Sequence, residues 1–301
     1  YEKFQKTEYI ALLNPYYAKK NKALINSLKD DVFDKLINIK QSVVNLKKKD
    51  TNICKNYLQK IGTSDYNFVC FHARDSFFLN KYNKDSRDWS YHDFRDSNIE
   101  SYSPAIEEMS NKNLLFFRMG LGTKNKLKYS NSKVIDYANS SDRSDLLDIY
   151  LSSKCLFFIG SESGITILPE TFNRPIVYLN WPGIDNTQAF ANNSIFIPRK
   201  FYSNKYNRFL TFKEIMELNF HDKFNSAYLR KLNIKLIDNT PQEIVEAVLE
   251  IHSRLTGTWQ LNKEDEDLQN KFWSLFKYKF LKSPTFRIGC SFLRNNQSLL
   301  N

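Results

Sequence analysis

Short apolar runs alternate with amphipathic stretches along the middle of the chain. The runs predict strands at residues 67–72, 114–119, 134–138, 155–159 and 176–180. The stretches between them predict helices at residues 99–111, 144–153 and 164–172. Continuous apolar strands separated by helices are typical of a parallel sheet that is covered on both faces. We therefore predict an α/β fold built on a Rossmann-like parallel sheet.

The alternation continues more weakly downstream, with strands at 194–197 and 234–238 and helices at 211–218 and 241–255. The helix at 241–255 has a well-marked start. Thr240 is placed as N-cap, Pro241 as first helical residue and Glu243 as the acid of a capping box.

The two ends of the chain differ from this middle part. Apolar spacing predicts helices at 18–29 and 31–48, and residues 262–301 predict a helix followed by an irregular tail. We expect three parts: a helical N-terminal lobe at 1–60, a Rossmann-like domain at 61–260, and a basic aromatic tail packed on it at 261–301.

The net charge of +11 is concentrated in these flanks. Residues 1–60 carry 13 Lys and 6 acids, or +7, and residues 271–301 carry +6, which leaves −2 for residues 61–270. A near-neutral central domain argues against a nucleic-acid partner. Basic residues that alternate with aromatics in the tail predict contact with an anionic membrane or a polyanionic acceptor, while a tail packed onto the domain with exposed Lys is the alternative.

No apolar run is long enough to cross a bilayer, so we expect a cytoplasmic protein with a peripheral contact at the inner membrane. The cysteines are far apart in the sequence and form no CxxC pair: Cys54, Cys70, Cys155 and Cys290. This spacing predicts buried free thiols and no zinc site.

Ligands of parallel α/β sheets bind beyond the carboxyl ends of the strands, so the residues after each apolar run are candidates. The first run ends in His72, Arg74 and Asp75. Arg74 can place two hydrogen bonds on a phosphate, with His72 beside it, or it can form a structural ion pair. Asp75 is a candidate general base, or it orients Arg74.

Two further strand ends carry polar residues. Arg118 and Gly120 follow the second run, which suggests an anion ligand followed by a loop. Further candidates follow the third run: Asp136, Tyr137, Arg143 and Asp148. Tyr137 could stack on a nucleobase and the carboxylates could accept from nucleoside hydroxyls, or these charges cap the helix start.

The fourth run leads into a loop of small residues, Gly160 to Gly164, ahead of a helix. Free backbone N–H groups at such a helix start, with the hydroxyls of Ser161 and Ser163, suit a phosphate. Glu162 is a second candidate base. The nucleophile elbow of hydrolases is the weaker alternative, because only His221 and His252 follow as triad partners.

A long loop after the first strand, residues 89–98, is crowded with aromatic and charged residues. Such a loop over a strand end is typical of a substrate wall. We predict acceptor contacts from four of its residues: Tyr91, His92, Asp93 and Arg95. A plain surface loop is the alternative.

Several stretches together resemble a family of bacterial surface-carbohydrate glycosyltransferase-like proteins. They are FVCFHARDSFFL (68–79), SYHDFRDSNI (90–99), FFRMG (116–120), VIDYANSSDRSDLLDIYLSSKCLFFIGSESG (134–164) and RIGCSFLRNNQSLL (287–300). More distantly, the HAR and LLDIYLSSKCLFFIGSESG stretches are similar to the donor half of fucosyltransferases of the GT-B type. The resemblance implies that residues 61–260 form a GT-B donor domain that binds a nucleotide sugar, and that residues 1–60 are a helical lobe or a remnant of an acceptor domain.

By position, the resemblance implies that Arg74 binds the donor diphosphate, Asp148 lies near the nucleoside, and Ser161 and Ser163 hold phosphate. It further implies transfer from a nucleotide sugar to a glycan or lipid-linked acceptor, with cationic side chains in place of a metal. A GT-B enzyme has two halves, so we expect an acceptor half upstream or a reduced helical lobe. A catalytically silent nucleotide-sugar or glycan-binding module is the alternative.

Overall fold

The computed structural model of the 301-residue chain describes residues 46–82, 88–123, 125–129, 131–184, 191–218, 225–276, 283 and 285–301. All of these residues belong to one compact unit that spans residues 40–301. The helix predicted at 18–29, and most of the one predicted at 31–48, lie outside the described residues.

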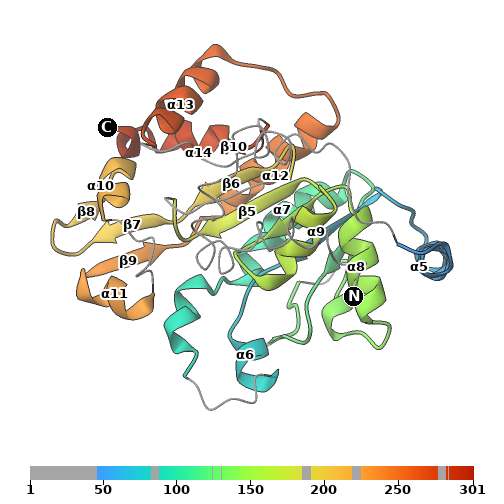
Figure 1. The fold of residues 1–301 in the computed structure, drawn as a ribbon. Helices are drawn as coiled ribbons and strands as arrows, with labels where there is room; N and C mark the ends of the chain where they lie inside the picture. Colours follow the sequence, from blue (N-terminus) through green and yellow to red (C-terminus); the bar gives the residue numbers. More distant parts are fainter. Residues whose placement is uncertain are drawn as a thin grey trace, which may run out of the picture. The chain divides into compact units, whose positions relative to one another are not determined.

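A seven-stranded parallel sheet forms the centre of the described part of the chain (Figure 1). Its strands are β1 (Phe68–His72), β2 (Leu115–Arg118), β3 (Val134–Ile135), β4 (Phe158–Gly160), β5 (Ile176–Trp181), β6 (Ile195–Pro198) and β10 (Arg287–Ile288). They lie in the order β10-β6-β5-β4-β1-β2-β3, and every pair is parallel. Strands β1 to β6 follow the order of a Rossmann-type sheet, and β10 is added at the edge beside β6. The predicted parallel α/β fold is confirmed.

The apolar runs form strands here because both of their faces are buried. The first four residues of β1 are fully buried, and so are the first five of β5 and all four of β6. In register, Cys70 lies between Phe117 of β2 and Phe158 of β4. The rings of Phe68 and Phe117 meet edge to face at 5.2 Å between centroids.

The described helices are α5 (Lys48–Lys60), α6 (Phe77–Tyr82), α7 (Ser103–Ser110), α8 (Asp145–Lys154), α9 (Ile167–Thr171), α10 (Phe212–Glu217), α11 (Ser226–Lys231), α12 (Pro241–Leu255), α13 (Lys263–Ser274) and α14 (Cys290–Asn295). Short 3-10 helices are η2 (Ser90–Arg95), η3 (Ile99–Tyr102), η4 (Tyr137–Asn139), η5 (Gly164–Thr166) and η7 (Gln297–Leu300). Helix α12 packs on α7 and on strands β5 and β6, while α8 packs on α5 and α9.

Helix α12 begins as the sequence predicts. The Thr240 side chain accepts from the Glu243 backbone N–H at 3.2 Å, and the Thr240 N–H donates to the Glu243 carboxylate at 2.8 Å. Pro241 is the first helical residue. The predicted capping box is therefore confirmed.

A second, antiparallel sheet follows β6. It contains β7 (Lys200–Ser203), β8 (Arg208–Phe209) and β9 (Ile234–Ile237) in the order β8-β7-β9. A strand at 234–238 was expected to continue the parallel alternation, and this expectation is wrong. The run pairs antiparallel with β7, and its burial alternates, as in a strand with one face exposed.

The C-terminal segment is more ordered than the sequence predicts. Instead of an irregular tail, it contains β10, which pairs with β6, and helix α14, which packs on α12 and α13. Phe272 of α13 is fully buried, and its ring lies 5.8 Å from Phe196 and 5.1 Å from Phe212. Phe272 is thus a core residue, while Tyr278 and Phe280 lie outside the described residues.

All four cysteines are buried and free, as predicted. Among the described residues, we find no helix that combines the length and apolar character needed to cross a membrane.

Candidate functional site

The carboxyl ends of β1 and β4 lie side by side where the strand order reverses. Strand β1 pairs with β2, the next strand in sequence, on one side. On its other side it pairs with β4. The backbone N–H of Arg74, just after β1, donates to the Ser161 hydroxyl at 2.8 Å, and the Ser161 N–H donates to the His72 carbonyl at 3.3 Å. Ligands of such sheets bind at this reversal. The structure thus brings together two strand ends that the sequence marks as candidates.

Arg74 is buried at this edge and points its guanidinium toward the loop that follows η2. Its Nη1 donates to the His92 carbonyl at 3.2 Å and to the Asp96 carboxylate. Its Nη2 is buried and has no hydrogen-bond partner among the described residues. Only 7% of the residue is exposed. A buried guanidinium remains protonated, so Arg74 retains one donor arm for a further acceptor.

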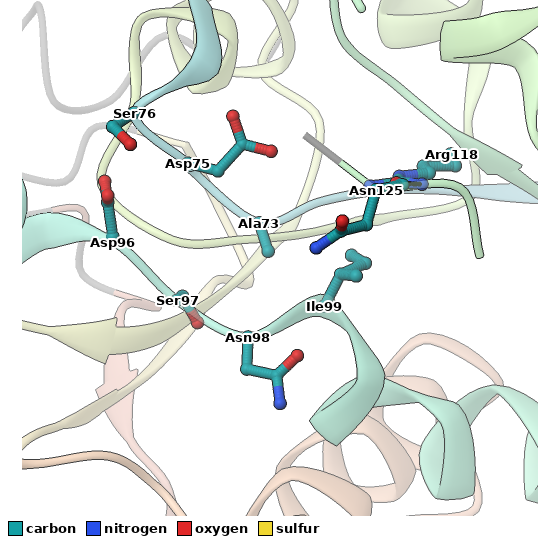
Figure 2. Close-up of a pocket in the computed structure, with 9 residues that line it drawn as sticks. All are labelled: Ala73, Asp75, Ser76, Asp96, Ser97, Asn98, Ile99, Arg118 and Asn125. Carbon is teal, nitrogen blue, oxygen red and sulfur yellow. Dashed lines mark hydrogen bonds between the residues drawn. The ribbon is translucent and has the colours of Figure 1, made fainter. Parts of the chain in front are cut away.

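A cavity of about 300 Å³ opens beside Arg74, at the carboxyl ends of β1 and β2 (Figure 2). Its lining residues are Ala73, Asp75, Ser76, Asp96, Ser97, Asn98, Ile99, Arg118 and Asn125. Figure 2 shows the carboxylates of Asp75 and Asp96 toward one end of the cavity and Arg118 with Asn125 toward the other. The cavity therefore has an acidic end and a basic end.

Arg118, the last residue of β2, supplies the basic end. Only 3% of it is exposed; its Nη1 donates to the Asn125 carbonyl at 2.8 Å and lies 3.6 Å from the Asp136 carboxylate. Asp136 also accepts from the Asn139 amide at 2.9 Å. Arg118 is thus a cation that reaches the cavity and is held by one carbonyl and a distant carboxylate.

His72 of β1 contacts the backbone at Met119 and Gly120, just after β2. The Nδ1 of His72 lies 2.9 Å from the Met119 carbonyl, and burial lowers the pKa of His72. The imidazole is therefore neutral at pH 7, with Nδ1–H as the donor. Gly120 has φ +140°, and a Cβ there would lie 3.3 Å from His72 Nδ1. Neither residue lines the cavity.

The acidic end contains one residue that sequence analysis did not single out. Asp75 accepts from the Phe77 N–H at 3.0 Å. Asp96, by contrast, is not among the residues predicted from the sequence, although it lies inside the SYHDFRDSNI stretch. Burial, with Asp93 and Asp75 nearby, raises the pKa of Asp96 to about 6, against the opposing effect of Arg74. In the sequence, Asp96 is marked only by its position next to the predicted acceptor residues. Its contact with Arg74 joins residues 22 positions apart and so leaves no local pattern.

The candidates after β3 lie outside the cavity lining. Tyr137 is fully buried, exchanges hydrogen bonds with the Ser144 backbone at 3.0 and 3.1 Å, and meets Phe117 edge to face. Its ring is therefore not presented for stacking on a base. Arg143 pairs with Asp148 of α8, whose Oδ1 is buried without a partner among the described residues. Burial raises the pKa of Asp148.

The loop after β4 is built differently from the sequence expectation. The helix predicted at 164–172 is a short 3-10 turn followed by five residues of α9, so little helix dipole faces the loop. The Ser163 hydroxyl is buried and has no partner among the described residues. A Cβ on Gly164 would meet open space.

The hydrolase alternative for this loop is wrong on the sequence itself. The central position between Gly160 and Gly164 is Glu162, whereas a nucleophile elbow has Ser there. Ser161 is fully buried, and its hydroxyl accepts from the Arg74 N–H, so it is not presented as a nucleophile.

None of the four predicted acceptor residues is among the residues that line the cavity. Tyr91 and Asp93 are exposed, and the ring of Tyr91 lies 4.0 Å from that of His92. Burial and the nearby charges of Arg95 and Arg74 lower the pKa of His92 to about 4.

Arg95 connects the acceptor loop to the loop after β4. Its Nε lies 3.4 Å from the Glu162 carboxylate, and its Nη2 donates to the Glu162 carbonyl at 3.3 Å. Glu162 is therefore engaged in an ion pair, and it is not among the residues that line the cavity.

The arrangement suits an anion that carries hydroxyl groups. Arg118 can hold a phosphate or carboxylate at the basic end, while Asp75 and Asp96 can accept from hydroxyls at the acidic end. Comparison of the chain with models of known protein families, with curated proteins and with solved structures finds no match in any of the three.

Proposed function

We propose that the chain is a glycosyltransferase of the GT-B type that moves a sugar from a nucleotide-sugar donor to a surface glycan or lipid-linked acceptor, without a metal. The observation that carries the proposal is the polarised cavity at the carboxyl edge of the Rossmann-type sheet. It combines a buried cation, Arg118, with carboxylates that can accept from sugar hydroxyls.

The roles follow from the two ends of the cavity. Arg118, with Arg74 behind it, would neutralise the diphosphate as the bond from the anomeric carbon to phosphate oxygen breaks and the electron pair stays on that oxygen. The acceptor hydroxyl would form the new bond to the anomeric carbon. Its proton would pass to a carboxylate. Asp75 is better placed for this than Glu162, because Asp75 lines the cavity and Glu162 does not.

Calorimetric titration with a panel of nucleoside diphosphates tests the binding half of the proposal. We expect at least one to bind, and Arg118→Gln to weaken its binding at least tenfold, about 1.4 kcal/mol. Arg208→Gln is the matched control, since Arg208 is exposed on β8 and pairs with Glu214. Absence of binding by every diphosphate, or equal binding by Arg118→Gln, would overturn the proposal.

A catalytically silent binding module is the second candidate. It is favoured by the engagement of both candidate bases, since Asp75 accepts from the Phe77 N–H and Glu162 pairs with Arg95. Incubation of the protein with donor sugars of the diphosphate that binds separates the two. Release of free sugar or its transfer to an added glycan, lost in Asp75→Asn, supports the enzyme; binding without either reaction supports the module.

A further inference from the structure

Arg74 is a strand-end cation with an unpaired guanidinium nitrogen among the described residues, yet its own chain already supplies it with one carboxylate. The Asp96 carboxylate accepts from Arg74 Nη1 and lines the cavity with part of its surface, since 29% of its side chain is exposed. Arg74 itself is 7% exposed and does not line the cavity. A ligand in the cavity thus meets Asp96 before it meets Arg74.

In the contact between the two side chains, only one of the two terminal nitrogens of the guanidinium donates to Asp96. A guanidinium presents two parallel N–H arms that a phosphate or carboxylate can occupy together. Asp96 occupies Nη1, while Nη2 is buried and has no partner among the described residues. A buried donor without a partner is unfavourable, so this pair is a weaker match for Arg74 than a two-armed anion would be.

The backbone around Asp96 is held, whereas its side chain has room to turn. Arg199 donates to the carbonyls of Phe94 and Asp96, and the Ser97 N–H donates to the Arg74 carbonyl at 2.9 Å. The Asp96 side chain, in contrast, faces the 300 Å³ cavity. Rotation of this one side chain would uncover Arg74 without movement of the loop.

We propose that Asp96 is an internal substitute for a phosphate at Arg74, and that an entering diphosphate replaces it there while the carboxylate turns into the cavity. That the anion is a nucleoside diphosphate rests on the proposed function. The carboxylate therefore competes with the ligand for the same guanidinium. The apparent affinity equals the intrinsic affinity multiplied by the fraction of molecules in which Asp96 has left Arg74.

The competition depends on pH because only an ionised carboxylate competes fully. Four charged groups face Asp96: Arg74 after β1, Asp75 beside it, Asp93 of η2 and Arg199 after β6. Burial and the two acids raise the pKa of Asp96 to about 6. Asp96 is therefore ionised and competing at pH 8, and protonated and weakly competing at pH 5.

The experiment measures the affinity of Asp96→Asn relative to the natural chain, by calorimetry with nucleoside diphosphates and with inorganic pyrophosphate. The ratio of affinities cancels the titration of the ligand's own phosphates. We expect Asp96→Asn to bind about tenfold more tightly at pH 8 and about equally at pH 5. Asp88→Asn removes an exposed charge that lies just ahead of this loop, and it is expected to stay within about twofold of the natural chain at both pH values.

The outcomes separate this inference from the proposed function. If a diphosphate binds and depends on Arg118, but Asp96→Asn binds it equally or more weakly at pH 8, the exchange is wrong and the proposed function stands. If no diphosphate binds to either chain at either pH, the proposed function fails and the exchange fails with it. Urea unfolding of each variant, with Asp96→Ser as a second substitution, shows that a change in affinity is not a loss of folded protein.

Discussion

Two buried arginine–carboxylate pairs in this molecule differ in how completely their polar atoms are used. In the pair near the C-terminus, Glu250 of α12 is 2% exposed and accepts from Arg254 at 2.8 and 2.9 Å. Its second oxygen accepts from the Cys290 N–H at 2.8 Å, and Arg254 lies over the ring of Trp259 at 4.5 Å.

The pair at the cavity, Arg74 with Asp96, is incomplete by comparison. One guanidinium nitrogen has no partner among the described residues, and the carboxylate has a pKa raised to about 6. A satisfied pair fastens elements together, here α12 to α14. A pair beside a cavity that leaves one guanidinium nitrogen without a partner can instead bind an acceptor from a ligand.

The largest effect that this comparison predicts is on stability, at the satisfied pair. Glu250→Ala leaves Arg254 and the Cys290 N–H without their acceptor, so the free energy of unfolding should fall by about 3 kcal/mol. Urea unfolding measures it, with Glu246→Ala on the same helix as control. A loss no greater than in that control would show that the satisfied pair does not fasten these helices.

A smaller effect of opposite sign is expected at the incomplete pair. The folded pKa of Asp96, about 6, lies above the ordinary value of 3.8, so folding binds a proton between these values. The stabilising effect is present below about pH 4 and is lost as pH rises through 6. Asp96→Asn should remove this loss and be more stable than the natural chain at pH 7 by about 2 kcal/mol.

The measurement is urea unfolding of both chains at pH 4 to 7, compared as a difference so that other titrations cancel. A constant difference over that range would mean that Asp96 keeps an ordinary pKa. That result would contradict the pH dependence expected of the incomplete pair.

The smallest effects are expected at the two serines after β4, which form a matched pair of substitutions. Ser161→Ala removes the acceptor of the Arg74 N–H and should cost about 1 kcal/mol of stability. Ser163→Ala removes a hydroxyl that has no partner among the described residues, so it should change stability by less than about 0.5 kcal/mol. Thermal unfolding compares them, and an equal loss in both would contradict the assignment of Ser163 as uncommitted.

The elements that the sequence predicts well are those determined by local pattern. The strands β1, β2, β5 and β6 are buried on both faces and show as continuous apolar runs. The convergence of Arg74 and Ser161 was also predictable, because parallel strands place their carboxyl ends at one edge.

The elements that the sequence predicts poorly are determined by partners that are far away in the sequence. Strand β10 is only two residues long and is defined by pairing with β6 more than 90 positions earlier. The importance of Asp96 depends on its contact with Arg74 and on the cavity between them, and neither leaves a periodic signal. Tyr137 was a reasonable stacking candidate by position, but its hydroxyl is bonded to the Ser144 backbone inside the fold.

The wall of the cavity is also connected, by two amides, to β5 and to the segment between β9 and α12. Asn180 at the end of β5 has φ +52° and exchanges 2.6 Å hydrogen bonds with Asn239, and its side chain donates to the Ser97 hydroxyl at 2.7 Å. Because these bonds run through side chains and not through a strand ladder, one substitution can shift Ser97 without changing any strand register. Related chains could thus acquire cavities of different width while the sheet stays the same.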